Sequence, residues 1–132
     1  MTNTCICGSG KPSEKCCSLL LNSTRWAKTP EQLMRSRYSA YALGGYGDYL
    51  LDTWFLATAK GLTAEALSLR TCDWVELQIL NKSQKGDQGT VEFNAWFLND
   101  QGDKQALHEK SVFQRINGRW LYVGGEVDST AG

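Results

Sequence analysis

The spacing of hydrophobic residues changes midway along the chain, from a helical period to a period of two. Between Thr29 and Leu43, Met34, Tyr38 and Tyr41 recur at helical spacing. Thr29 precedes a proline and Gln32 stands three positions on, which is the pattern of a capped helix start. We therefore predict a helix over residues 30–43, with Arg35 and Arg37 off its apolar stripe.

The end of this helix and two further helices follow from glycine and threonine positions. Gly44-Gly45 is expected to stop the first helix, because glycine readily adopts the conformation that ends one. A second helix is predicted at about 47–56, and Thr63 is a candidate cap for a short third one through Leu69.

From Asp73 onward, apolar and polar residues alternate, which predicts β-strands. The last hairpin is the clearest, since Asn117-Gly118 between apolar segments favours a two-residue type I′ turn. That turn places Arg115 opposite Trp120, Phe113 opposite Tyr122 and Ser111 opposite Gly124. One sheet face should then carry Glu109, Ser111, Phe113, Arg115, Trp120 and Tyr122. The sequence predicts an α+β fold, with three helices packed on one face of a curved antiparallel sheet.

Four of the five cysteines lie near the start of the chain, at Cys5, Cys7, Cys16 and Cys17. Two close thiol pairs joined by Gly8-Ser9-Gly10 can surround one tetrahedral ion, and a closed set of four cysteines is typical of structural zinc. Redox chemistry, a Cys16–Cys17 disulfide or an iron–sulfur cluster are the alternatives. Cys72 is too distant along the chain to join the set.

Charge divides the chain unevenly although its formal net charge is zero. Residues 1–37 carry six basic and two acidic side chains, and the remainder carries a net −4. A basic head suggests an anionic partner. A second interpretation is that the cations offset a zinc tetrathiolate, whose formal charge is −2. The candidate partner contacts are Lys11, Lys15, Arg25, Arg35 and Arg37.

Neither a membrane span nor a secretory signal is evident, since no apolar stretch approaches about 20 residues. The first residues also lack the basic and then apolar pattern of a signal peptide. These observations predict a soluble cytoplasmic protein, in which clustered cysteines more often bind metal than form disulfides.

Two sets of motifs resemble known families. Cys5-Ile6-Cys7-Gly8-Ser9-Gly10 with Cys16-Cys17 resembles the SEC-C zinc motif. The rest resembles the YchJ-like family of uncharacterised bacterial proteins, through the segments 33–41, 48–54, 108–113 and 117–122. Many members carry a second cysteine motif at the C-terminus, where this chain has none, and a histidine where Phe55 stands.

The resemblance implies a cone-shaped, nuclear-transport-factor-2-like (cystatin-like) domain with a pocket between sheet and helices. We expect a zinc module at 1–21 and this domain at 29–127. The candidate pocket residues are Tyr38, Trp54, Glu109, Ser111, Phe113, Arg115, Trp120 and Tyr122. Val112, Leu121 and Val123 on the outer sheet face suit a homodimer interface.

Two functional hypotheses follow. The first is a zinc-binding adaptor whose basic head contacts an acidic protein, or a ribosomal or lipid-phosphate surface. The second is an enzyme that performs acid–base chemistry on a small hydrophobic ligand, with Glu109, Asp52 and His108 as candidate groups. The hairpin register puts His108 on the opposite sheet face from Glu109, which weakens the second hypothesis.

Overall fold

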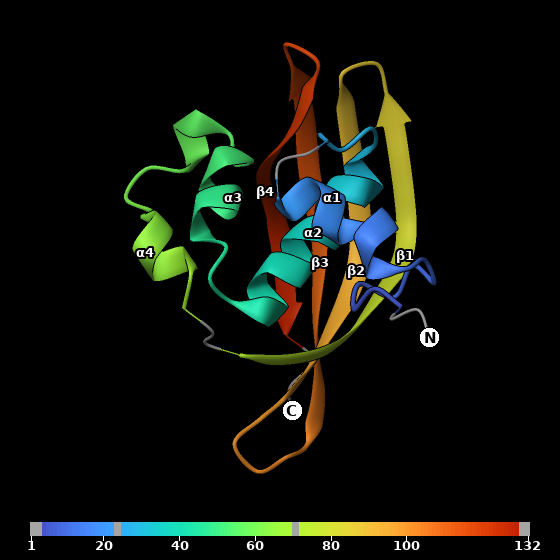
Figure 1. The fold of residues 1–132 in the computed structure, drawn as a ribbon, viewed down its shortest axis with the longest axis vertical. Helices are drawn as coiled ribbons and strands as arrows, with labels where there is room; N and C mark the ends of the chain where they lie inside the picture. Colours follow the sequence, from blue (N-terminus) through green and yellow to red (C-terminus); the bar gives the residue numbers. More distant parts are fainter. Residues whose placement is uncertain (1–3, 23–24, 70–71, 130–132) are drawn as a thin grey trace.

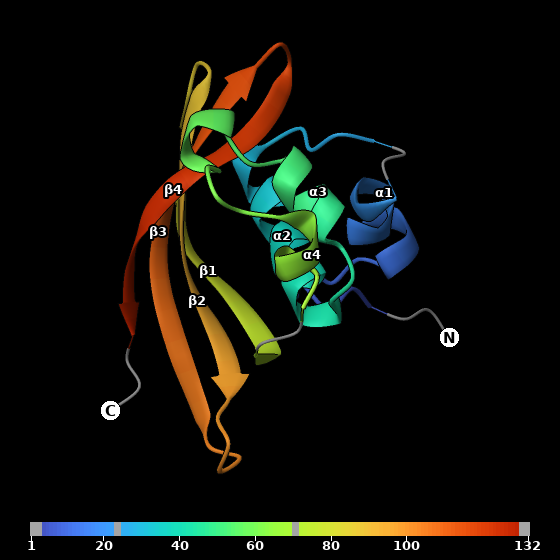
Figure 2. The ribbon, with the colours of Figure 1, turned by 90° about the vertical axis from the view of Figure 1, so that its left-hand side faces the viewer.

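A computed structural model describes residues 4–22, 25–69 and 72–129 and shows helices on one face of a strongly bent sheet (Figures 1 and 2). The sheet is an antiparallel meander in the order β1-β2-β3-β4. Its strands are β1 (Asp73–Lys85), β2 (Gln88–Leu98), β3 (Lys104–Ile116) and β4 (Arg119–Ser129). This arrangement confirms the predicted α+β class. None of the helices described is both long and apolar enough to cross a bilayer.

The N-terminal segment contains a short 3-10 turn, η1 (Ser13–Lys15), and α1 (Cys17–Leu21). The helices that follow are α2 (Pro30–Leu43), α3 (Gly47–Asp52) and α4 (Ala64–Leu67), with the 3-10 turn η2 (Leu56–Thr58) between the last two. In Figure 2, α1, α2, α3 and α4 lie on the same side of the sheet, with α1 farthest from it.

The start of α2 is capped as predicted, with one change. Thr29 Oγ1 accepts from the backbone N–H of Gln32 at 3.1 Å. The Gln32 side chain accepts from Lys28 N–H rather than from Thr29. The helix ends at Leu43, and Gly44 follows in a left-handed conformation with φ 74°, so both predicted boundaries are confirmed.

The second predicted helix is shorter than expected, because the chain leaves it to pair with the edge of the sheet. Thr53 O accepts from Tyr122 N–H at 2.8 Å, and Phe55 N–H donates to Tyr122 O at 2.7 Å. Trp54 thereby bridges to β4 in parallel. This non-local pairing ends α3 at Asp52.

The β3–β4 hairpin has the predicted turn but only part of the predicted register. Asn117 and Gly118 have φ 52° and 81°, as a type I′ turn requires. Phe113 does face Tyr122, but a bulge then places Gly124 opposite Val112. The expected pairing of Ser111 with Gly124 was therefore wrong, since Val123 is an extra residue in β4.

The interior is one hydrophobic cluster that the cysteine module and the body share. Leu33, Leu50 and Phe113 are at most 1% exposed, and Cys7 and Cys17 belong to the same cluster. The module is thus packed into the core of the molecule.

A cysteine centre, a cationic cleft and an internal cavity

The first two cysteines lie on a small closed loop. Cys5 N–H donates to Lys11 O at 2.8 Å, and Gly8 N–H donates to Cys5 O at 3.2 Å. Gly8 adopts φ 81°, and a Cβ there would lie 3.3 Å from Leu77 O on β1. Only glycine meets both demands, so this turn holds the loop closely against the sheet.

The second pair of cysteines comes from the start of α1. Cys16 precedes the helix and Cys17 is its first residue. All four Sγ atoms lie within 4.8 Å of one another. The Cys7–Cys16 and Cys16–Cys17 Sγ separations are 3.6 and 4.0 Å. Zinc–sulfur bonds of about 2.3 Å place tetrahedral sulfurs roughly 3.8 Å apart, so the cluster has the dimensions of a zinc tetrathiolate.

Without a metal ion, the cluster favours a single sulfur anion, at Cys7, because the pKa values of Cys16 and Cys17 are raised. A hydrogen bond from Cys17, helped by Ser9, lowers the pKa of Cys7 to about 4 despite burial. The bond to Cys7 and burial raise the pKa of Cys17. Ser9 Oγ lies 3.2 Å from Cys16 Sγ and accepts from Lys11 N–H. A central cation would let all four sulfurs be thiolates at once.

Ser39 on α2 supports this interpretation from outside the cluster. Its hydroxyl is buried and has no hydrogen-bond partner among the described residues. It lies beside Cys17, whose pKa it acts to lower. A thiolate at Cys17 would give this buried hydroxyl an acceptor, which fits a metal-bound cysteine.

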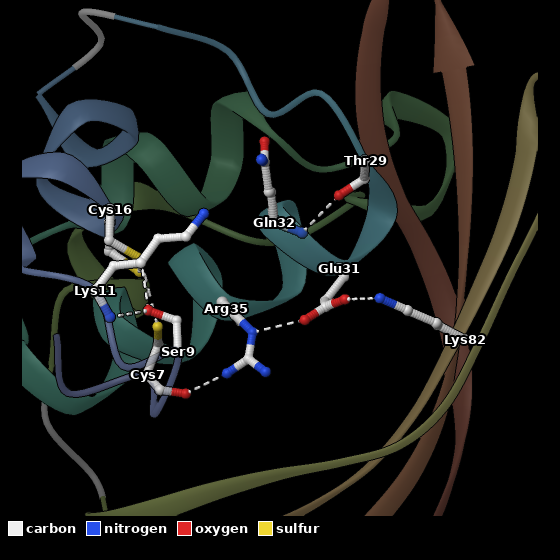
Figure 3. A network of polar contacts seen from close by, with 10 residues as sticks. Cys7, Ser9, Lys11, Cys16, Thr29, Glu31, Gln32, Arg35 and Lys82 are labelled. Carbon is white, nitrogen blue, oxygen red and sulfur yellow. Dashed lines mark hydrogen bonds and ion pairs between the residues drawn. The ribbon is translucent and has the colours of Figure 1, made fainter.

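Arg35 joins the cysteine loop to the body (Figure 3). Its Nη1 donates to Cys7 O at 2.7 Å, and its Nε donates to Glu31 Oε2 at 2.9 Å. Glu31 also pairs with Lys82 on β1. Arg35, a predicted partner contact, is therefore already engaged by Glu31 and Cys7 O within the protein.

A cleft of about 470 Å³ opens beside the cysteines, between the module and α2. Lys11, Lys15 and Arg25, three of the predicted partner contacts, line it, and Figure 3 shows Lys11 extending from the module toward α2. Lys28, Arg35 and Lys82 complete its basic lining, and Glu31 is the one acidic residue. The sequence analysis missed Lys82, which only the fold brings to this place.

Arg37 lies elsewhere, in the core, which corrects its prediction as a surface contact. It is 3% exposed because α3 and the Thr53–Phe55 segment cover that side of α2. Nη1 donates to Leu50 O and Thr53 Oγ1, each at 2.8 Å. The guanidinium lies 4.7 and 4.6 Å from the ring centroids of Trp54 and Tyr122.

A second hollow, of about 250 Å³, lies between α2 and the sheet. Four predicted pocket residues line it: Tyr38, Trp54, Glu109 and Tyr122. The other lining residues are Met34, Arg37, Tyr41, Trp74, Phe93, Ala95 and Leu107.

The remaining predicted pocket residues have other positions. Ser111, Phe113 and Trp120 are buried in the core. Arg115 lies at the far end of the sheet, paired with Asp87 at 2.8 Å and 5.0 Å from the Trp120 ring centroid. The cavity occupies only one end of the concave face, which alternation along a strand does not reveal.

Glu109 is the acidic residue of the cavity lining and is held in place. Its Oε2 accepts from Tyr122 Oη at 3.0 Å and from the Ser111 hydroxyl. Burial, and then Glu109, raise the pKa of Tyr122, which therefore stays neutral and donates. His108 Nε2 lies 2.7 Å from Glu92 on the other sheet face, as predicted.

Comparison with known proteins agrees with both parts of this structure. Residues 1–19 match the SEC-C motif, and residues 29–125 match the middle NTF2-like domain of YchJ. This chain belongs to the YchJ-like family. A UPF0225 protein of Vibrio parahaemolyticus is 38% identical over 129 residues, covering 95% of this chain and 75% of its own length.

Two solved structures of SEC-C motif containing proteins share the fold. The solution structure from Rhodopseudomonas palustris has a TM-score of 0.85 and 42% identity, covering 94% of this chain and 98% of that one. The crystal structure from Psychrobacter arcticus has a TM-score of 0.81 and 26% identity, covering 98% and 85%. The similarity in fold therefore extends over both the cysteine module and the body.

Proposed function

We propose that this YchJ-like protein is a zinc-binding adaptor that docks an acidic polypeptide segment in the cationic cleft. The observation that carries this proposal is the convergence of basic side chains from the module, its connector to α2 and β1 around one hollow. The metal centre supports the wall of that hollow, since Cys16 and Cys17 line it too.

Zinc is the ion that suits the centre best. The donors are four cysteines, three of them buried, and a complete set of protein ligands leaves no position for a substrate. Such an ion is structural. Elemental analysis of the purified protein should find one zinc per chain, whereas iron would contradict this assignment.

The cleft has cations available for a partner. Lys11, Lys15, Arg25 and Lys28 are exposed, and none has an ion pair within the described ranges. Glu31, by contrast, is engaged by Arg35 and Lys82. An acidic partner would therefore meet positive charge without displacing an internal ion pair.

The shape and apolar rim of the cleft favour a peptide over a nucleic acid. The basic residues surround one hollow instead of forming a long stripe, and the whole chain has no net charge. Trp26 on the wall is 57% exposed, and Leu19 lies nearby in the lining. An acidic segment with an apolar anchor would use both features.

Fluorescence anisotropy with a labelled peptide of alternating glutamate and leucine tests the proposal. We expect binding that weakens about tenfold when salt is raised from 50 to 300 mM, because exposed charges are screened. Replacing Lys11 and Lys15 with glutamate should abolish it. The matched control replaces Lys60 and Lys85, exposed lysines outside the cleft lining.

Three results would overturn the adaptor proposal. Equal loss of binding in both double variants would show that only overall charge matters. Tighter binding of a single-stranded oligonucleotide than of the peptide would assign the cleft to nucleic acid. Absence of any binding would leave the cations with the role of offsetting the thiolates.

The positions of the candidate acid–base groups favour a binding protein over an enzyme. His108, the only histidine of the chain, lies outside the cavity with Glu92 as its partner. Glu109 Oε2 already accepts from two hydroxyls, so that oxygen is engaged within the protein. We therefore place binding ahead of acid–base catalysis.

The outer sheet face remains a candidate homodimer surface. Val112 is exposed there, and Leu121 and Val123 are half-buried. A light-scattering mass of two chains that reverts to one chain in a Val112→Lys variant would support this pairing. A mass of one chain for the unaltered protein would exclude it.

A further inference from the structure

The cavity between α2 and the sheet, which is open to solvent, has the size and walls of a site for a flat ring system. A cavity of about 150 Å³ can hold benzene, so 250 Å³ suits one or two fused rings. Trp54 and Tyr122 meet edge to face at 5.1 Å, and Tyr38 meets Trp74 likewise at 6.5 Å. These ring pairs brace one another and form rigid aromatic walls.

One wall of the cavity carries a fixed donor. Both hydrogen bonds of Arg37 come from Nη1. Within the residues described, Nε and Nη2 have no hydrogen bond to a carbonyl or carboxylate, and the Tyr41 hydroxyl interacts with this guanidinium. A guanidinium has five N–H groups, so this one can still donate to a ligand.

A fixed acceptor belongs to the same lining. Glu109 Oε2 accepts from Tyr122 and Ser111, while Oε1 has no hydrogen bond among the residues described. Gly125 leaves room for this carboxylate, since a Cβ there would lie 2.7 Å from Oε2. The cavity thus holds a donor and an acceptor in place before any ligand arrives.

The charges of the lining select against ions. Arg37 and Glu109 are the only charged residues that line the cavity in the described part of the chain, and their formal charges cancel. Glu109 would repel an anionic ligand, and Arg37 would repel a cationic one. A hydrocarbon would enter but would cover both groups without pairing them.

We propose that this cavity binds an uncharged aromatic molecule of one or two rings that carries a hydrogen-bond acceptor next to a donor, as in a cyclic amide. Its acceptor bonds to Arg37 and its donor bonds to Glu109. The rings lie among the aromatic walls. This site is separate from the cationic cleft and does not depend on the adaptor proposal.

Calorimetric titration of the full chain with three probes of similar size tests the proposal. They are 2-quinolone, naphthalene and 2-naphthoate, which differ in polar edge and charge. We expect 2-quinolone to bind about tenfold more tightly than either of the others, because only it pairs both groups. Equal affinities, or no binding of 2-quinolone below about 1 mM, would overturn the proposal.

Two variants locate the binding and test its charge selectivity. Glu109→Gln gives the cavity a net positive charge. The affinity for 2-naphthoate relative to that for 2-quinolone should therefore rise about tenfold. The control, Glu92→Gln, removes a carboxylate from the other sheet face and should change neither affinity. Unchanged selectivity in Glu109→Gln would refute the assigned role of this residue.

Ala95→Leu should abolish binding of 2-quinolone, because it fills part of the cavity from β2. Retained binding in a folded Ala95→Leu protein would place the ligand elsewhere. If Ala95→Leu fails to fold, as far-ultraviolet circular dichroism would show, Leu107→Phe blocks the cavity from a half-buried position on β3.

Discussion

At the scale of single residues, two arginines of one helix have different roles that their spacing does not predict. Arg35 ties the cysteine loop to α2 through Cys7 O. Arg37, two positions on, lies in the core over two aromatic rings. Both were predicted to face a partner, because a charged side chain off the apolar stripe is usually solvated. Here α2 is covered from several sides, so that expectation does not apply.

Ser39 gives a prediction at this scale. Ser39→Ala should lower metal affinity by about tenfold, because it removes the buried hydroxyl that lies beside Cys17 and can donate to its thiolate. Competition with a chromophoric chelator measures the change. Ser36→Ala is the matched control, since Ser36 is also buried on α2 but bonds to Leu33 O and Tyr49. Equal effects of the two changes would contradict the role of Ser39 at the metal centre.

At the scale of elements, the structure departs from local expectation where elements pair across the chain. The bulge at Val123 shifts β4 by one residue relative to β3 beyond Phe113. Pairing of Thr53–Phe55 with Tyr122 shortens α3. Together these two features position Trp54 and Tyr122 over Arg37, and so build one wall of the cavity.

The contact between α2 and β1 yields a prediction about pH. Lys82, and then Arg35, lower the pKa of Glu31 in the folded protein. Glu31 therefore adds stability above its unfolded pKa of about 4.3, and this is lost as pH falls through the lower folded value. Glu31→Gln should lower the melting temperature at pH 7, by the equivalent of at most about 1 kcal/mol.

The difference between Glu31→Gln and the unaltered protein should shrink as pH falls below about 4.3, which thermal scans over pH can follow. Glu76→Gln serves as the control, because its pair with Lys104 is half-exposed on both sides. A gap of the same size at pH 3 and pH 7 would show that Glu31 does not act through its charge.

At the scale of the whole molecule, the shared hydrophobic cluster couples the metal centre to the body. Cys7 and Cys17 pack in the same cluster as Leu33 and Phe113. Zinc removal by a chelator should therefore lower the melting temperature of the body by several degrees, since about 1 kcal/mol corresponds to roughly 3–5 °C at this size.

Tryptophan fluorescence reports on the body, because Trp54, Trp74 and Trp120 lie within it. Cys17→Ser should reproduce the shift without chelator, whereas Cys72→Ser, outside the cluster, should leave it unchanged. A body transition at the same temperature with and without metal would instead show that the segments 1–21 and 29–127 are independent units.

The sequence by itself determined those features of this protein that depend on residues close together along the chain. Cysteine spacing, the Thr29 cap, the Asn117-Gly118 turn and strand alternation act over a few residues, so the sequence predicts the cysteine cluster, the helix start and the sheet. Only the tertiary structure decided which charges are buried and which converge. Arg37, Glu109 and Tyr122 meet in one cavity, and Lys11 and Lys82 meet in one cleft, because packing joins residues that are distant along the chain.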